Sequence, residues 1–126
     1  MAAPQKRSEQ LAETLRTLVS GSTDIQGVAV ISMDGLVIAA ELPSKLDQAR
    51  VGAVAAGILS LSGRSVGQLQ RGELQQTLIQ GSDGNVIITH AGKNAAFVAL
   101  TGKDVNLGMA FLETREGAQK VSEILG

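Results

Sequence analysis

The chain has 126 residues with 11 basic and 12 acidic side chains, a net charge of −1, and no basic stripe that would favour binding to nucleic acid. It has no cysteine, which excludes disulfides, thiol nucleophiles and sulfur-ligated zinc, and its only aromatic residues are two Phe, too few for stacking on single-stranded nucleic acid. The length suits a single domain over residues 1–126. Because neither the first ten residues nor any longer run is apolar enough for a signal or a membrane span, we expect a soluble, cytoplasmic protein without membrane insertion.

An amphipathic helix is predicted from about Ser8 to Gly21. Ser8 is a favourable N-cap residue because its hydroxyl accepts hydrogen bonds from the free backbone N–H groups of a first helical turn. Leu11, Leu15 and Leu18 recur three or four residues apart, which places them on one stripe of the helix. We expect this stripe to lie on a sheet.

A β-hairpin is predicted next, with strands at residues 27–32 and 36–40 around the turn Asp34-Gly35. Glycine adopts the positive φ of such a turn at little cost, and β-branched runs flank it on both sides. Both runs are almost wholly apolar and do not alternate with polar residues. This pattern is typical of strands covered on both faces.

The longest predicted element is a helix from Leu46 to about Leu69, preceded by Ser44 and Asp47 as an approximate capping box. One half of its helical wheel holds larger apolar residues: Val51, Val54, Ile58, Leu61, Val66 and Leu69. The opposite half holds small residues where a solvated helix would be charged: Ala49, Gly52, Ala53, Ala56, Ser60 and Gly63. Each interior glycine costs about 1 kcal/mol relative to alanine, so the small half favours the close approach of another helix.

Three further strands and a helix complete the chain. Residues 73–80 mix polar and apolar side chains, which favours a strand at the edge of the sheet. The runs 86–91 and 95–100 extend it to a meander. A last helix is predicted after Asn106 as N-cap, with an apolar stripe of Phe111, Ala118, Val121 and Leu125. The order is α-β-β-α-β-β-β-α, without an internal repeat or a second domain.

No constellation of catalytic residues is visible in the sequence. His90 is the only histidine and has no carboxylates at metal-ligand spacing, so we expect neither a metal site nor a cofactor. Gly92-Lys93 and Gly102-Lys103 lack the other residues of a P-loop and are predicted turns. Arg64 and Arg71 are disfavoured as arginine fingers, because exposed arginines are mostly solvated. We therefore expect a protein that is not an enzyme.

Several segments together resemble the roadblock domain family. Residues 27–39 are similar to its first hairpin, with the pattern glycine, apolar run, Asp-Gly, apolar run. The resemblance continues through the Ala-rich middle helix and residues 74–80, and Val105-Asn106-Leu107-Gly108-Met109 is similar to the segment that leads into the family's last helix. It covers nearly the whole chain, from about Ser8 to Leu125.

This resemblance implies an α+β sandwich of the profilin-like kind. The expected sheet has five antiparallel strands in the order 2-1-5-4-3, with the middle helix on one face and the first and last helices on the other. The resemblance also implies a homodimer in which the third strands pair and the middle helices lie together. The expected dimer-interface residues are Gly52, Ala53, Ala56, Ser60, Gly63, Glu73, Leu74, Gln75, Gln76, Thr77, Leu78 and Ile79.

Roadblock proteins include dynein light chains and regulators of Ras-like small GTPases. The resemblance implies a homodimeric interaction module that regulates or scaffolds such a GTPase, with GTPase activation by reshaping the partner's switch regions as one form of that role. The alternative function, from a different class, is a small-ligand sensor. A sensor would need a cavity with a few convergent polar groups.

Overall fold

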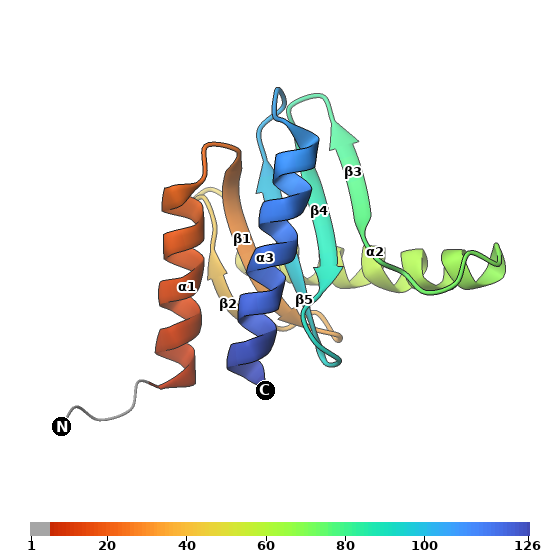
Figure 1. The fold of residues 1–126 in the computed structure, drawn as a ribbon, viewed down its shortest axis with the longest axis horizontal. Helices are drawn as coiled ribbons and strands as arrows, with labels where there is room; N and C mark the ends of the chain where they lie inside the picture. Colours follow the sequence, from red (N-terminus) through yellow and green to blue (C-terminus); the bar gives the residue numbers. More distant parts are fainter. Residues whose placement is uncertain (1–5) are drawn as a thin grey trace.

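The computed structural model describes residues 6–126, in which three helices and five strands follow the order expected from the sequence (Figure 1). The elements are α1 (Arg7–Gly21), β1 (Ile25–Ser32), β2 (Val37–Glu41), α2 (Gln48–Gln68), β3 (Thr77–Gly81), β4 (Gly84–His90), β5 (Ala95–Thr101) and α3 (Leu107–Leu125). The expectation about a signal at the start of the chain falls in part on residues 1–5, which lie outside the described residues.

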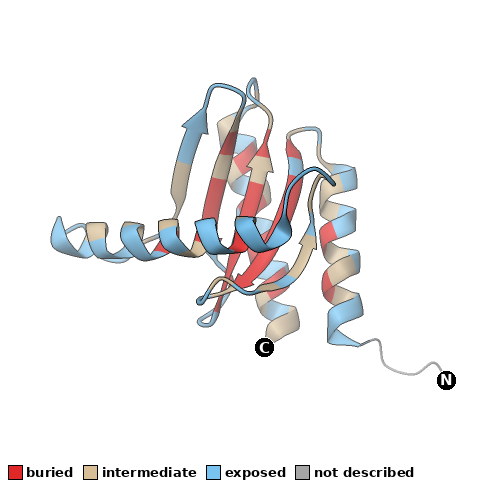
Figure 2. Cartoon of the chain, turned by 180° about the vertical axis from the view of Figure 1, so that it is seen from behind, coloured by how far each residue is buried: buried red, intermediate tan, exposed pale blue. Residues whose placement is uncertain are grey.

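The five strands form one antiparallel sheet in the order β2-β1-β5-β4-β3, as the resemblance implies. Helices α1 and α3 lie side by side on one face, and α2 crosses the other face (Figures 1 and 2). Strands β1 and β5 occupy the middle of the sheet, whereas β2 and β3 are its two edges. The fold is therefore the profilin-like α+β sandwich, with two unlike edges.

Each face of the sheet carries its own core. Under α1 and α3, fully buried residues include Leu15, Val30 and Phe97. Under α2, the core is smaller and is built around Ala55, Leu59 and the strand residues that they contact. The face under α2 is therefore covered with less apolar side chain than the opposite face.

The helix starts differ from the expected ones in two of three cases. Helix α1 begins at Arg7 with Lys6 as N-cap and no side-chain bond, so the prediction of Ser8 as cap was wrong. Asp47 is itself the N-cap of α2 and accepts from the backbone N–H of Ala49 at 3.1 Å, which replaces the expected capping box. Asn106 caps α3 as predicted and accepts from the N–H of Met109 at 3.1 Å.

Strand β2 also corrects an expectation. Strand β1 is covered on both faces as predicted, but β2 is only half-buried, and Ile38 within it is 43% exposed. The reason is its position at an edge, where no further strand or helix flanks it on its outer side. Its pairing with β1 is also irregular, with a register shift between Val30 and Ile31.

Candidate functional site

Strand β3 is an edge that pairs only with β4. It spans Thr77–Gly81, so it begins four residues later than the predicted 73–80. Among the residues expected at an interface, Glu73, Gln75 and Ile79 are exposed, and Leu74, Gln76, Thr77 and Leu78 are half-buried. The outer backbone N–H and C=O groups of this strand are open to another strand, as edge positions generally are.

Two side chains at the start of β3, Gln76 just before it and Thr77 as its first residue, lack hydrogen-bond partners within the subunit. The side-chain nitrogen of Gln76 and the hydroxyl of Thr77 are buried and have no hydrogen-bond partner. The neighbouring carbonyl of Gln75 accepts from the hydroxyl of Thr89 at 3.1 Å. Buried polar atoms without partners cost free energy, so this end of the strand is an unusually unfavourable part of an isolated subunit.

Helix α2 extends past β3, so that its last turns have no strand of its own chain beneath them (Figures 1 and 2). Only three of its residues are buried, namely Gly52, Ala55 and Leu59, all before Ser60. From Ser60 onward every residue is half-buried or exposed. We call residues 60–68 the overhang of α2.

The small side of α2 meets the sheet of its own chain. A Cβ at Gly52 would lie 2.3 Å from the carbonyl oxygen of Gly35, in the β1–β2 turn, and 3.1 Å from a methyl group of Val37. Gly35 has φ +92°, and a Cβ there would in turn lie 3.2 Å from Cβ of Ala56. The expectation that Gly52 awaits a partner helix is therefore corrected, because its close neighbour is the turn of the same subunit.

The same stripe continues into the overhang, where it is no longer packed closely. Gly52, Ala56, Leu59 and Gly63 are spaced by four, three and four residues, so they share one side of the helix. Gly63 has nothing within 4 Å of the position that a Cβ would occupy. Among the other expected interface residues, Ala53 and Ser60 are exposed.

The opposite side of α2 is apolar and exposed. Val54 is 54% exposed and Leu61 is 60% exposed, and the two are seven residues apart on the same side of the helix. Sequence reasoning did not single them out as contact residues. The available signal was their place on the larger-residue half, because only one half of a surface helix can lie on its own sheet.

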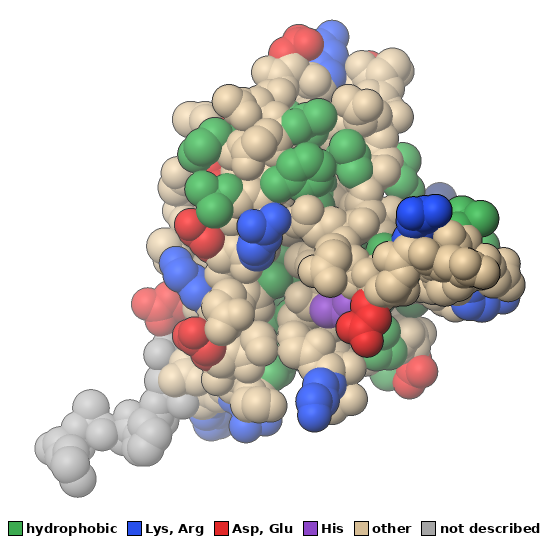
Figure 3. Space-filling view, turned by 45° about the vertical axis from the view of Figure 1, so that its right-hand side comes forward, with side chains coloured by type: hydrophobic (Ala, Val, Ile, Leu, Met, Phe, Trp, Pro, Cys, Tyr) green, Lys and Arg blue, Asp and Glu red, His purple; other side chains and the backbone are tan. Residues whose placement is uncertain are grey.

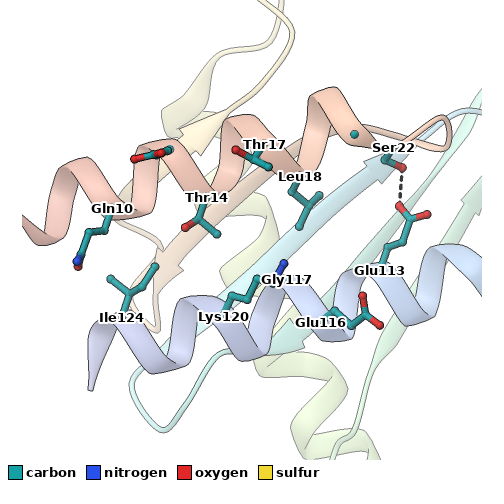
Figure 4. A pocket seen from close by; sticks show the side chains of 12 residues that line it. Gln10, Thr14, Thr17, Leu18, Ser22, Glu113, Glu116, Gly117, Lys120 and Ile124 are labelled. Atoms are coloured by element: carbon teal, nitrogen blue, oxygen red, sulfur yellow. Dashed lines mark hydrogen bonds between the residues drawn. The ribbon is translucent and has the colours of Figure 1, made fainter. Parts of the chain in front are cut away.

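Two surface hollows are candidate ligand sites for a sensor. A groove of about 680 Å³ runs between α1 and α3, where the hydroxyl of Ser22 donates to the carboxylate of Glu113 (Figure 4). A smaller hollow of about 400 Å³ under α2 is lined in part by Ser60, Arg64 and the exposed His90. Residues 6–126 contain no group of three or more His, Asp or Glu that could hold a metal ion. None of their helices is long and apolar enough to cross a membrane.

Comparisons with known proteins agree with this geometry. The model of the Roadblock/LC7 domain family matches residues 4–101. The protein MJ1340 of Methanocaldococcus jannaschii is 36% identical over 97 residues, which cover 77% of this chain and 84% of that protein. A Roadblock/LC7 domain from Streptomyces avermitilis is 30% identical, with a TM-score of 0.70 over 88% of this chain and 97% of that one.

The gliding protein MglB of Thermus thermophilus shares only 16% of its residues with this chain, but its structure superposes with a TM-score of 0.82 over 98% of this chain and 94% of that one. At this identity, the likeness concerns the fold. The family is shown by the match of the family model and by the relatives of 30% identity or more. The chain belongs to the Roadblock/LC7 domain family.

Proposed function

We propose that this protein is a non-enzymatic, cytoplasmic, homodimeric interaction module that regulates or scaffolds a Ras-like small GTPase. The observation that carries the proposal is the overhang of α2, which projects beside the unpaired edge of β3 (Figure 2). A helix that packs on a sheet with one half and projects past its edge with the other is incomplete as a single subunit. A second sheet placed against β3 would complete it.

Pairing of β3 with its copy supplies that second sheet. The two sheets would join into one of ten strands, and the overhang of each α2 would lie over the strands of the other subunit. Gly63 and Val66 would then contact the partner's sheet in the way that Ala56 and Leu59 contact their own. A twofold arrangement satisfies both surfaces with one self-complementary patch, which is the usual geometry of homodimers.

The proposed dimer interface keeps the expected residues except Gly52 and Ala56, which pack against their own subunit. It comprises Ala53, Ser60, Gly63, Glu73, Leu74, Gln75, Gln76, Thr77, Leu78 and Ile79. One of the solved MglB structures is described as having a tetrameric arrangement, so a protein of this fold does associate with copies of itself.

Ile79→Lys is expected to dissociate the dimer. Ile79 is the middle residue of β3 and is 40% exposed, so the single subunit tolerates lysine there. Antiparallel pairing about the strand centre sets residue 79 against its own copy at about 5 Å, where like charges repel. The molecular mass measured by sedimentation should fall from twice 13.0 kDa for the dimer to 13.0 kDa for the single chain.

Leu36→Lys is the matched control for this experiment. Leu36 is 70% exposed in the β1–β2 turn, away from the edge formed by β3, so this variant should remain a dimer. A wild-type chain that sediments as a monomer, or an Ile79→Lys variant that stays dimeric, would contradict the proposed interface.

The outer side of α2 is the surface that we assign to the GTPase. Val54 and Leu61 face away from the sheet, and Arg50 and Arg64 are exposed on the same helix. An exposed apolar surface with charged surroundings is typical of a protein-binding site. Binding that is tighter for one nucleotide state of the GTPase would shift its conformation by that difference in affinity.

Leu61→Glu is expected to abolish capture of a Ras-like GTPase from the same organism, since a carboxylate would be buried without a partner. The measurement is binding to the GTPase loaded with GDP or with a non-hydrolysable GTP analogue, together with its rate of GTP hydrolysis. Leu36→Glu should bind like the wild type. Equal binding by Leu61→Glu and the wild type would refute this surface, and no binding to either nucleotide state would refute the GTPase as partner.

A further inference from the structure

The hollow under α2 lies at the start of the overhang and has a volume of about 400 Å³. Its lining comes from the β1–β2 turn, from one side of α2, from the connection between α2 and β3, and from the end of β4. The lining residues are Met33, Ala56, Leu59, Ser60, Gly63, Arg64, Leu74 and His90. Pockets for small molecules have about 300–1,000 Å³, so the hollow is large enough for a small ligand.

The lining of the hollow is largely apolar. Leu59 is buried in the core under α2, and Leu74 packs at the margin of the same core. Met33 is exposed, and Gly63 has nothing within 4 Å of the position that a Cβ would occupy. The hollow therefore offers apolar surface that the chain itself does not fill.

The charged group in this lining is basic. Arg64 is exposed, and so is His90, whose side chain Figure 3 shows in purple at the molecular surface. None of the described residues that line the hollow is an Asp or a Glu, although the exposed Asp34 and Glu73 are neighbours of lining residues in the sequence. The groove between α1 and α3, in contrast, is lined by three glutamates and one lysine. An anion fits the hollow under α2 better than a cation does.

The guanidinium of Arg64 matches a carboxylate, which arginine binds through two parallel hydrogen bonds. Ser60 precedes Arg64 by four residues, so its hydroxyl lies on the same side of the helix. At about 30 Å³ for each water-sized group, the hollow holds about a dozen non-hydrogen atoms. We propose that it binds a free carboxylic acid with an unbranched chain of about eight carbons, with the carboxylate at Arg64 and the chain on Leu59 and Leu74.

This ligand would regulate the dimer, a consequence that rests on the proposed function. Ser60, Gly63 and Leu74 line the hollow and also belong to the proposed dimer interface. Gly63 would contact the partner's sheet in the dimer, so the second subunit would take the space that the ligand occupies in a single subunit. The two therefore exclude each other. At about nine times its dissociation constant, the ligand stabilises each single subunit about tenfold and raises the dissociation constant of the dimer about a hundredfold.

The probe is octanoate, titrated into the full chain carrying Ile79→Lys, which presents the hollow in a single subunit. Calorimetry should show one octanoate per chain, whereas octylammonium, with the same chain and the opposite charge, should not bind. Arg64→Gln in this background should weaken octanoate binding at least about tenfold, because charge-assisted hydrogen bonds are lost. Arg50→Gln is the matched control, since Arg50 is exposed on the same helix and does not line the hollow.

A second pair of variants tests the place of binding independently of charge. Gly63→Leu should abolish octanoate binding, because the new side chain would enter the open space of the hollow. Gly57→Leu is the same change at another open glycine of α2 that does not line the hollow, so it should bind like its parent. Equal binding by Gly63→Leu and Gly57→Leu would overturn the assignment, and so would no binding of octanoate or equal binding of octylammonium.

Sedimentation of the wild-type chain tests the link to the dimer. Octanoate should shift the chain from dimer to single subunits, and octylammonium should not. A dimer that persists at a saturating concentration of octanoate would overturn the exclusion of ligand and partner. A wild-type chain that sediments as single subunits without octanoate would instead overturn the proposed dimer, and the titrations above would then decide the ligand site alone.

Discussion

Gly52→Ala is expected to lower the free energy of unfolding by about 3 kcal/mol, near the upper end of the usual cost of overpacking. The added methyl group would lie 2.3 Å from the carbonyl oxygen of Gly35, and backbone cannot move aside as the end of a flexible side chain can. Relief of this contact requires α2 to move away from the β1–β2 turn. Chemical denaturation at one fixed chain concentration measures the loss, since the proposed dimerisation would make stability depend on concentration.

Gly57→Ala is the matched control in the same helix. The space around Gly57 is open to at least 4 Å, and the residue is exposed, so the substitution should raise stability by about 1 kcal/mol through helix propensity alone. Changes of opposite sign in the free energy of unfolding at two glycines five residues apart would show that the contact with Gly35 determines the effect. The general cost of a glycine in a helix would then not explain it. A loss of stability in Gly57→Ala, or a gain of stability in Gly52→Ala, would contradict the packing described for α2.

Phe97→Ala is expected to lower stability by about 3–5 kcal/mol, the largest loss from a single truncation in this chain. Phe97 lies in the central strand β5, is completely buried, and is the largest of the fully buried side chains. A Cβ at Gly117 of α3 would lie 2.9 Å from the far end of its ring, so helix and ring are already in close contact. The cavity left by alanine could not be filled without movement of α3.

Phe97→Leu and Phe111→Ala test this explanation. Leucine leaves a smaller cavity, so Phe97→Leu should cost less than Phe97→Ala when both are measured by urea denaturation. Phe111 is only half-buried, and its truncation should cost clearly less as well. Equal losses for Phe97→Ala and Phe111→Ala would mean that burial does not set the cost.

Most of the fold could be predicted from local patterns in the sequence. The Asp34-Gly35 turn between two apolar runs fixes the first hairpin, and Asn106 marks the start of α3. The edge position of β3 was indicated by its polar residues, since a strand covered on both faces carries few of them. The order of the strands came from the family resemblance, because hydrophobic periodicity does not report which strands are neighbours.

The orientation of α2 could not be predicted, for a physical reason. A helical wheel separates Gly52 and Ala56 from Val54 and Leu61, but it does not say which half lies on the sheet. The larger apolar half is the usual choice for a core. Here the β1–β2 turn approaches so closely that only small residues fit beside it, so Val54 and Leu61 are left exposed, while Val51 and Ile58 still pack at the margin of the core. That contact joins residues far apart in the sequence.

The exposure of Met109 and Leu112 on α3 agrees with the predicted apolar stripe of Phe111, Ala118, Val121 and Leu125, which leaves both residues out. Their exposure follows from the direction that Ala110, Thr114 and Gly117 face, which is set by contact with the sheet and with Leu18 of α1.

The irregular pairing of β2 bears on how far assembly of these subunits can proceed. A sheet with two open edges could in principle add subunits without end and grow into a fibre. Strand β2 pairs with β1 in a register that shifts between Val30 and Ile31, and it ends at the charged Glu41, two features that oppose the addition of another strand. In the proposed dimer, polymerisation would therefore stop at two subunits, with a β2 strand at each outer edge of the joined sheet.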